Sequence, residues 1–311
     1  MPLTPPGVPD VALIDPDRPA YRARPVPATG VRGRAAMTDS DCIGFLQAAL
    51  PRLGLRWPGF RKVRRLVCKR LARRLRELNL PDLAAYRAFL DSRPGEWAIL
   101  DGYCRIPISR FYRDREIFEH LEHVVLPALA EATVAAGRSE LACWSACCAS
   151  GEEPYTLAIL WRLRLRHRFP GLSFRIVATD IDSQLLERAR TGCYQASSLK
   201  ALPPPLLAEA FTRHGEQLCV RHEFRAIEIF QQDIRQTVPE SEFDLVLCRN
   251  AVLTYFEPAL QHEVMGRVVA RLRPGGALVI GMHESLPENL QGFVPWRGAR
   301  AIYRKLAPAS A

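Results

Sequence analysis

The sequence lacks the features of membrane, secreted and metal-binding proteins. It has no apolar run of about 18 residues, so we expect no membrane-spanning helix. Its first residues lack the basic-then-apolar pattern of a signal peptide. None of its nine cysteines form a Cys-x-x-Cys pair, and no spacing of cysteine, histidine and acidic residues predicts a metal site. We therefore expect a cytoplasmic protein with reduced thiols and no bound metal.

Two nucleotide-binding signatures are also missing. The sequence contains no Gly-x-x-x-x-Gly-Lys-Ser/Thr segment, which excludes a P-loop. The turn after the first predicted sheet strand contains one glycine, Gly151, where the dinucleotide fingerprint needs three. A nicotinamide or flavin site is therefore disfavoured.

Three stretches each combine an apolar strand with polar residues at its carboxyl end. They are Trp144–Tyr155, Ile176–Asp182 and Phe243–Asn250. In an open α/β sheet, ligands bind beyond the carboxyl ends of the strands, where the strand order reverses. The spacing from Glu153 to Asp180 leaves room for one crossover helix, as in a βαβ unit of about 30 residues. Any one stretch is also typical of an ordinary capped turn, but the three in order favour a site for a nucleoside with a zwitterionic tail.

These motifs resemble those of the CheR family, S-adenosylmethionine-dependent methyltransferases that esterify glutamate side chains on chemotaxis receptors. The most specific matches are Gly-Glu-Glu-Pro-Tyr, which begins at Gly151, and Cys-Arg-Asn-x-x-x-x-Tyr-Phe, which begins at Cys248. Ser109–Arg113 is similar to the family's Thr-x-Phe-Phe-Arg, and Lys69–Arg76 is similar to its basic N-terminal helix. The resemblance covers roughly 45–305.

The resemblance implies S-adenosylmethionine as the cofactor and assigns residues to it. Asp180 would bind the ribose hydroxyls, and Glu153 would bind the amino end. Asp233 and Ile234 follow the strand that flanks the adenine in the family. The other implied cofactor-binding residues are Ser109, Arg113, Arg249 and Asn250.

The same resemblance implies two catalytic residues. Tyr255 would lie beside the transferred methyl group, and Arg113 could bind a carboxylate of the cofactor or the substrate with both arms of its guanidinium. Two alternatives stay open. Tyr255 could be a half-buried aromatic residue at a helix start, and Arg113 could form a surface ion pair with Glu116 or Asp114.

Several positions depart from the family pattern. Pro107 replaces the usual Asn before the Thr-x-Phe-Phe-Arg motif, and proline has no backbone donor. Ser109 and Tyr112 replace the Thr and the second Phe of that motif. The family's Gly-His-Ser-Glu contains Met282 and His283 here, which displaces the histidine by one position. The identity of the methyl acceptor is therefore left open by the motifs.

Three other functions remain to be weighed against a protein-glutamate O-methyltransferase. One is methylation of another carboxylate or a small molecule, and another is a regulatory module that binds the cofactor without turnover. A nucleic-acid amine methyltransferase is disfavoured, because such enzymes typically carry a Pro-Pro-Tyr or Pro-Pro-Phe turn where this chain has Arg249-Asn250-Ala251-Val252.

The pattern along the chain predicts an α/β fold preceded by a small all-α domain. Residues 1–36 are rich in Pro and Arg, and we expect them to be disordered. Helical periodicity predicts a basic helical domain over 37–104. Over 105–311 the pattern predicts a sheet covered by helices, with a small antiparallel insert at 193–228 and a final edge strand at 301–303. The family resemblance implies that this sheet is a Rossmann-like class I methyltransferase sheet.

Positive charge is concentrated in one segment of a chain whose net charge is +10. Eleven basic residues and no acid lie between Arg52 and Arg76. A solvated helix face and a nucleic-acid surface are two interpretations, although the run lacks interleaved aromatics. The family resemblance adds a third, in which the helix attracts an acidic protein substrate, the cytoplasmic region of chemoreceptors, and raises the encounter rate. We expect a monomer.

Overall fold

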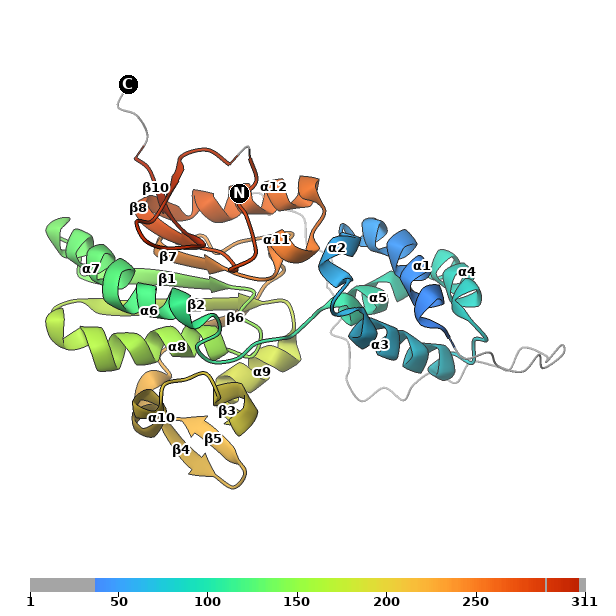
Figure 1. Ribbon diagram of the computed structural model, residues 1–311, viewed down its shortest axis with the longest axis horizontal. Helices are drawn as coiled ribbons and strands as arrows, with labels where there is room; N and C mark the ends of the chain where they lie inside the picture. The colour runs from blue at the N-terminus through green and yellow to red at the C-terminus, as the bar shows by residue number, and fades with distance from the viewer. Residues whose placement is uncertain (1–36, 289, 308–311) are drawn as a thin grey trace, which may run out of the picture. The chain divides into compact units, whose positions relative to one another are not determined.

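The computed structural model of the protein describes residues 37–288 and 290–307 (Figure 1). The segment 1–36, predicted to be disordered, lies outside the described residues. In the part of the chain that is described, every helix is too short or too polar to cross a bilayer. Helices make up the first part of the described chain, and a mixed sheet covered by helices makes up the rest.

Between residues 37 and 104 the structure places five α-helices. They are α1 (Asp39–Ala49), α2 (Trp57–Phe60), α3 (Arg64–Glu77), α4 (Leu83–Ser92) and α5 (Glu96–Cys104). α1 begins where the side chains of Thr38 and Asp41 form a capping box, which satisfies backbone donors of the first turn. Apolar side chains of α1, α3, α4 and α5 share one core that includes Phe45, Leu71 and Tyr86. We refer to residues 37–104 as the helical part.

Seven strands of the described chain form the main sheet, in the order β6-β2-β1-β7-β8-β10-β9. They are β1 (Glu140–Ala146), β2 (Ser173–Asp180), β6 (Glu228–Gln231), β7 (Phe243–Cys248), β8 (Leu272–Val279), β9 (Phe293–Pro295) and β10 (Ile302–Lys305). The five strands from β6 to β8 are parallel, and β10 and β9 run antiparallel to their neighbours.

Helices cover both faces of this sheet. They are α6 (Arg115–His120), α7 (Leu126–Ala135), α8 (Glu152–Leu160), α9 (Ser183–Thr191), α11 (Val252–Tyr255) and α12 (Pro258–Ala270). Successive residues of β1 enter opposite cores, because side chains alternate along a strand. Cys143 packs in the core that holds α6, α7 and α8, whereas Trp144 packs in the core that holds α12. This three-layer arrangement confirms the predicted Rossmann-like α/β fold.

The strand order reverses beside β1. β2, which follows β1 in sequence, pairs with one edge of β1, and β7 pairs with the other. The carboxyl ends of these three strands therefore meet at one edge of the sheet. That edge is where an open α/β sheet binds its ligand.

A second, smaller sheet is formed by the segment of the chain between α9 and β6. It has the order β3-β5-β4 and is antiparallel throughout. Its elements are β3 (Cys193–Gln195), α10 (Pro204–Ala210), β4 (Phe211–His214) and β5 (Gln217–Val220). The predicted small antiparallel insert is thereby confirmed.

Two expectations are wrong. The strand at the C-terminal end, β10, is not the edge, because β9 pairs with its outer side. The expectation that all cysteines are reduced also fails, because disulfides join Cys42 to Cys68 and Cys193 to Cys219. The first pair meets where α1 packs on α3, and the second pair lies directly opposite in the β3–β5 ladder. Spacing along the sequence reveals neither contact.

Candidate functional site

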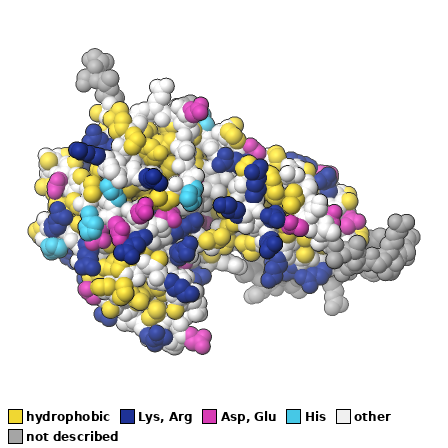
Figure 2. All heavy atoms as spheres, in the orientation of Figure 1, with side chains coloured by type: hydrophobic (Ala, Val, Ile, Leu, Met, Phe, Trp, Pro, Cys, Tyr) yellow, Lys and Arg dark blue, Asp and Glu magenta, His cyan; other side chains and the backbone are white. Residues whose placement is uncertain are grey.

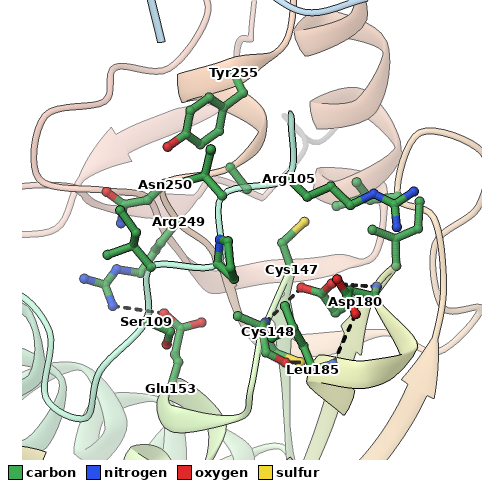
Figure 3. Close-up of a pocket in the computed structure, with 18 of the residues that line it drawn as sticks. Arg105, Ser109, Cys147, Cys148, Glu153, Asp180, Leu185, Arg249, Asn250 and Tyr255 are labelled. Atoms are coloured by element: carbon green, nitrogen blue, oxygen red, sulfur yellow. Dashed lines mark hydrogen bonds and ion pairs between the residues drawn. The ribbon is translucent and has the colours of Figure 1, made fainter. Parts of the chain in front are cut away.

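A pocket lies at the carboxyl ends of β1, β2 and β7 (Figure 3). All nine residues assigned from sequence to the cofactor or to catalysis line it. They are Ser109, Arg113, Glu153, Asp180, Asp233, Ile234, Arg249, Asn250 and Tyr255. Figure 3 shows Asp180 and Glu153 reaching the pocket from different segments, with Asn250 and Tyr255 across from them. The structure thus brings together residues that span 147 positions, from 109 to 255.

The turn after β1 brings backbone close to the pocket. Cys147 and Ala149 have φ values of 56° and 50°, and Gly151 has a φ of 88°. A side chain at Gly151 would bring a Cβ to 2.8 Å from the Cβ of Ala189, so the position requires glycine. Burial raises the pKa of the Cys147 and Cys148 thiols, which keeps these pocket-lining groups neutral. Small, neutral residues therefore form this wall.

Asp180 is fixed at the end of β2 by backbone donors. Its Oδ2 accepts a hydrogen bond of 2.8 Å from the N–H of Ala149, and its Oδ1 accepts one of 2.9 Å from the N–H of Asp182. Burial raises the pKa of Asp180 above its ordinary value, and these two donors partly oppose the shift. The carboxylate retains further lone pairs, so it can accept hydrogen bonds from a pair of ligand hydroxyls.

Glu153 belongs to a network centred on Arg249. The Arg249 side chain is only 3% exposed, and its Nη1 donates a hydrogen bond of 2.9 Å to Glu153. Its Nη2 donates to Asp114 at 2.6 Å and to the carbonyl of Arg113 at 2.9 Å. Ser145 donates a bond of 2.7 Å to the other oxygen of Glu153. The network orients Glu153 and leaves it able to bind a cationic amino group.

Arg113 does not form the surface ion pair considered as an alternative. Its Nη1 donates a hydrogen bond of 2.7 Å to the carbonyl of Ile108, while Asp114 pairs with Arg249. No ion pair joins Arg113 to Glu116 among the residues that the structure describes. The guanidinium of Arg113 lines the pocket instead.

Tyr255 is the last residue of α11, not the first of a helix. Its ring centre lies 5.0 Å from that of Phe60 in α2. Burial raises the pKa of the Tyr255 hydroxyl, and the neighbouring Arg113 partly opposes this. The hydroxyl is therefore protonated at neutral pH and can donate a hydrogen bond into the pocket.

Sequence reasoning missed the partners of Asp233. Arg235 contacts both oxygens of Asp233 at 2.9 to 3.1 Å and donates two more bonds, of 2.7 and 3.1 Å, to Asp101 of α5. Arg105 also donates to Asp101, at 3.0 Å. All four side chains line the pocket. The acid and base two residues apart, Asp233 and Arg235, were a signal in the sequence, whereas Asp101 had none.

In the basic segment 52–76, some cations bond to other groups of the protein and others are exposed without a carboxylate partner. Arg64 pairs with Asp39, and Arg74 pairs with Glu96, each at 2.8 Å. Arg70 donates to the backbone carbonyls of Tyr103 and Arg105. Within the segment 52–76, all of which is described, the exposed cations without a carboxylate partner are Arg61, Lys62, Arg65, Lys69 and Arg76. We call these five residues, which lie in α3 or just before it, the α3 basic surface. Figure 2 shows several Lys and Arg side chains on the visible face of the helical part.

Comparison with known proteins gives a consistent result. A family model described as "CheR methyltransferase, SAM binding domain" matches residues 108–301. The chemotaxis protein methyltransferase of Salmonella typhimurium is 31% identical over 272 residues, which cover 84% of this chain and 88% of that protein. Chemotaxis protein methyltransferase 2 of Pseudomonas aeruginosa is 35% identical over 230 residues, covering 71% of this chain and 78% of that protein.

A third relative is much longer. An uncharacterized 104.1 kDa protein in the hypE 3' region of Rhodobacter capsulatus is 34% identical over 249 residues. The match covers 79% of this chain but only 26% of that protein. The chain therefore spans about a quarter of the length of that relative and most of the length of the other two.

Proposed function

Because the chain belongs to the CheR family of S-adenosylmethionine-dependent methyltransferases, we propose that it methylates glutamate side chains of an acidic protein substrate, the cytoplasmic region of chemoreceptors. The observation that carries the proposal is the pocket at the reversal of strand order, which collects all nine residues assigned from the motifs. The pocket also collects Ser109, Arg113 and Tyr255, which do not belong to the strand ends.

The polar groups in the pocket fit the cofactor. Asp180 is a half-buried carboxylate whose hydrogen-bond partners among the described residues are backbone donors, which suits two ribose hydroxyls. Glu153 is a carboxylate held by Arg249 and Ser145, which suits an ammonium group. Ile234 is 6% exposed and provides an apolar surface for an adenine ring, with Asp233 beside it. The contacts that these residues would make with the cofactor are part of the proposal.

The site needs to orient its reactants more than it needs to move protons. S-adenosylmethionine, when bound, supplies a methyl group on a positively charged sulfur. The acceptor glutamate, with a pKa near ~4.3, is already ionised at neutral pH, so no strong base is needed. Correct alignment alone can contribute about 7–11 kcal/mol. The protonated hydroxyl of Tyr255 can donate a hydrogen bond that positions the reacting end.

Two cations at the pocket favour an anionic acceptor. Arg113 and Arg110 both line it, and Arg110 is exposed with no carboxylate partner among the described residues. A carboxylate that enters the pocket would gain charge-assisted hydrogen bonds from either guanidinium. These two arginines therefore support a carboxylate acceptor.

The helical part supplies a surface for a protein substrate. The α3 basic surface presents five exposed cations that are not used in packing. We propose that it attracts the acidic substrate, with 37–104 acting as a substrate-facing domain and 105–311, including the insert at 193–228, as the methyltransferase domain. Long-range attraction of this kind raises association rates and weakens with salt.

The proposal is tested by transfer of labelled methyl groups. The wild-type protein is incubated with labelled S-adenosylmethionine and a lysate that contains chemoreceptors, and labelled proteins are separated and identified. We expect label on receptors. Tight binding of S-adenosylhomocysteine without transfer to any acceptor would instead identify a cofactor-binding regulatory module.

A further inference from the structure

The short helix that carries Tyr255 is held from two sides by residues outside the set of nine. We propose that Arg56 and Glu284 are positioning residues that fix α11, and with it Tyr255, for methyl transfer. The inference rests on the proposed function, because it presumes that Tyr255 acts at the reacting end. Neither Arg56 nor Glu284 lines the pocket, so both would act through α11.

Glu284 holds α11 from the side of the sheet. Its Oε2 accepts the N–H of Gly281 at 2.6 Å and the N–H of Asn250 at 3.0 Å. Its Oε1 accepts a hydrogen bond from the hydroxyl of Thr254, the residue before Tyr255. One carboxylate thus joins the segment after β8, the segment after β7 and α11. Because a carboxylate accepts several bonds at once, it suits a junction where three donors converge.

The backbone around Glu284 is shaped for this junction. A Cβ at Gly281 would lie 2.8 Å from Oε2 of Glu284 and 2.9 Å from the side-chain oxygen of Asn250. Glycine is therefore required for the carboxylate to approach. Asn250 itself has a φ of 55°, a left-handed conformation that needs support from its surroundings.

Arg56 holds α11 from the helical part. Its Nε donates a hydrogen bond of 3.1 Å to the carbonyl of Thr254, and its Nη2 donates one of 2.5 Å to the carbonyl of Leu253. Its backbone N–H donates to the carbonyl of Tyr255 at 2.8 Å. These carbonyls have no partner within the helix, at the C-terminal end where a cation is favourable. The side chain of Gln261 also donates to the carbonyl of Leu253, at 3.1 Å.

Close packing supports the contact with Arg56. At Gly59 in α2, an added Cβ would clash with the carbonyl oxygen of Thr254 and would lie 3.1 Å from the ring of Tyr255. An isolated antiparallel bridge pairs Leu55 with Phe256 beside the same turn. Arg56 is one of the eleven cations of the basic segment, and its guanidinium is committed to α11. Its role is therefore distinct from that of the α3 basic surface.

A displacement of about 1 Å at a reacting group can reduce turnover roughly 100-fold without a comparable loss of binding. Thr254→Val replaces the hydroxyl that bonds Glu284 with a methyl group of similar size, and Arg56→Ala removes the guanidinium that bonds the carbonyls. We expect each variant to lower kcat by roughly 10- to 100-fold. The Kd for S-adenosylhomocysteine and the KM for the receptor substrate should each stay within about threefold of wild type, because neither contact touches a ligand.

Control variants distinguish a loss of positioning from a general loss of the folded structure. Thr254→Ser keeps the hydroxyl and should retain the wild-type kcat. Arg87→Ala removes an exposed arginine of α4, elsewhere in the helical part, and should also leave kcat unchanged. Calorimetric binding of S-adenosylhomocysteine by every variant confirms that the fold is intact.

The outcomes are distinct. A fall in kcat for Thr254→Val and Arg56→Ala, with rescue by Thr254→Ser, supports the inference. Wild-type rates for both variants would overturn it and leave the proposed function standing, whereas absence of transfer by the wild-type protein would overturn both. Equal losses in Thr254→Val and Thr254→Ser would also count against it, since the hydroxyl would then not be the cause.

Discussion

Asp180, at the end of β2, accepts a 2.8 Å hydrogen bond from the N–H of Ala149 in the turn after β1. The bond joins the segments that follow β1 and end β2, and both line the pocket. The same carboxylate therefore holds the turn in place and lines the pocket. Loss of Asp180 should disturb both at once.

The first prediction is that Asp180→Ala weakens the binding of S-adenosylhomocysteine by about 1–3 kcal/mol, through lost hydrogen bonds to a charged group. Isothermal titration calorimetry measures the change. Glu187→Ala, at an exposed position of α9, is the control and should bind as wild type. Unchanged affinity in Asp180→Ala would remove Asp180 from the cofactor site.

The second prediction concerns pH. Burial raises the pKa of Asp180 above its ordinary value of 3.8, so the folded state holds that proton more tightly than the unfolded state. The stability that this provides is present below pH 3.8 and is lost as pH rises through the folded pKa. Asp180→Asn has no such titration, so its free energy of unfolding relative to wild type should increase with pH in this window. Denaturant unfolding at a series of pH values tests this, and parallel pH profiles for the two proteins would contradict it.

The third prediction concerns Tyr255. Tyr255→Phe keeps the ring that packs on Phe60 and removes the hydroxyl. It should lower kcat and kcat/KM together while cofactor affinity changes little, which marks an interaction made mainly in the transition state. Tyr303→Phe in β10, outside the pocket, serves as the control. Steady-state kinetics decide, and full activity of Tyr255→Phe would argue that the residue only packs.

The fourth prediction addresses the α3 basic surface. Reversal of Arg65 and Lys69 to Glu should lower kcat/KM for a receptor substrate and leave cofactor affinity nearly intact. The wild-type rate should also fall as salt rises, because exposed charges are screened over about 10 Å at 0.1 M. Arg64 is left unchanged, since it pairs with Asp39 and its reversal would disturb α1. Rates indifferent to both salt and charge reversal would mean that this surface is only solvated.

The sequence was sufficient to predict the parts of the fold that depend on local pattern. β7 (Phe243–Cys248) is apolar enough to be recognised as a buried central strand, and polar residues follow at its carboxyl end. Parallel strands place such ends at one edge, so the convergence of Asp180, Glu153 and Asn250 follows from topology. The nine residues themselves were assigned through the family resemblance, and all nine line the one pocket at that edge.

Other features depend on contacts between distant segments. Asp101 and Arg235 lie 134 residues apart and meet only because α5 packs beside the pocket. Cys193 and Cys219 oppose each other through strand register, which spacing alone does not determine. β9 has three residues, Phe293–Pro295, and a segment that short has no measurable period. Its Pro295 is consistent with an edge position, because proline cannot donate to a ladder.

The central claim is that the transferred methyl group ends on a glutamate oxygen of a receptor. The direct measurement is to treat labelled receptor with mild alkali and to follow the volatile label while peptide mapping locates the modified residues. An ester releases its methyl group as methanol, so the account predicts alkali-labile label at glutamate positions. Label that survives alkali, as N-methyl groups do, or label on other residue types would contradict it.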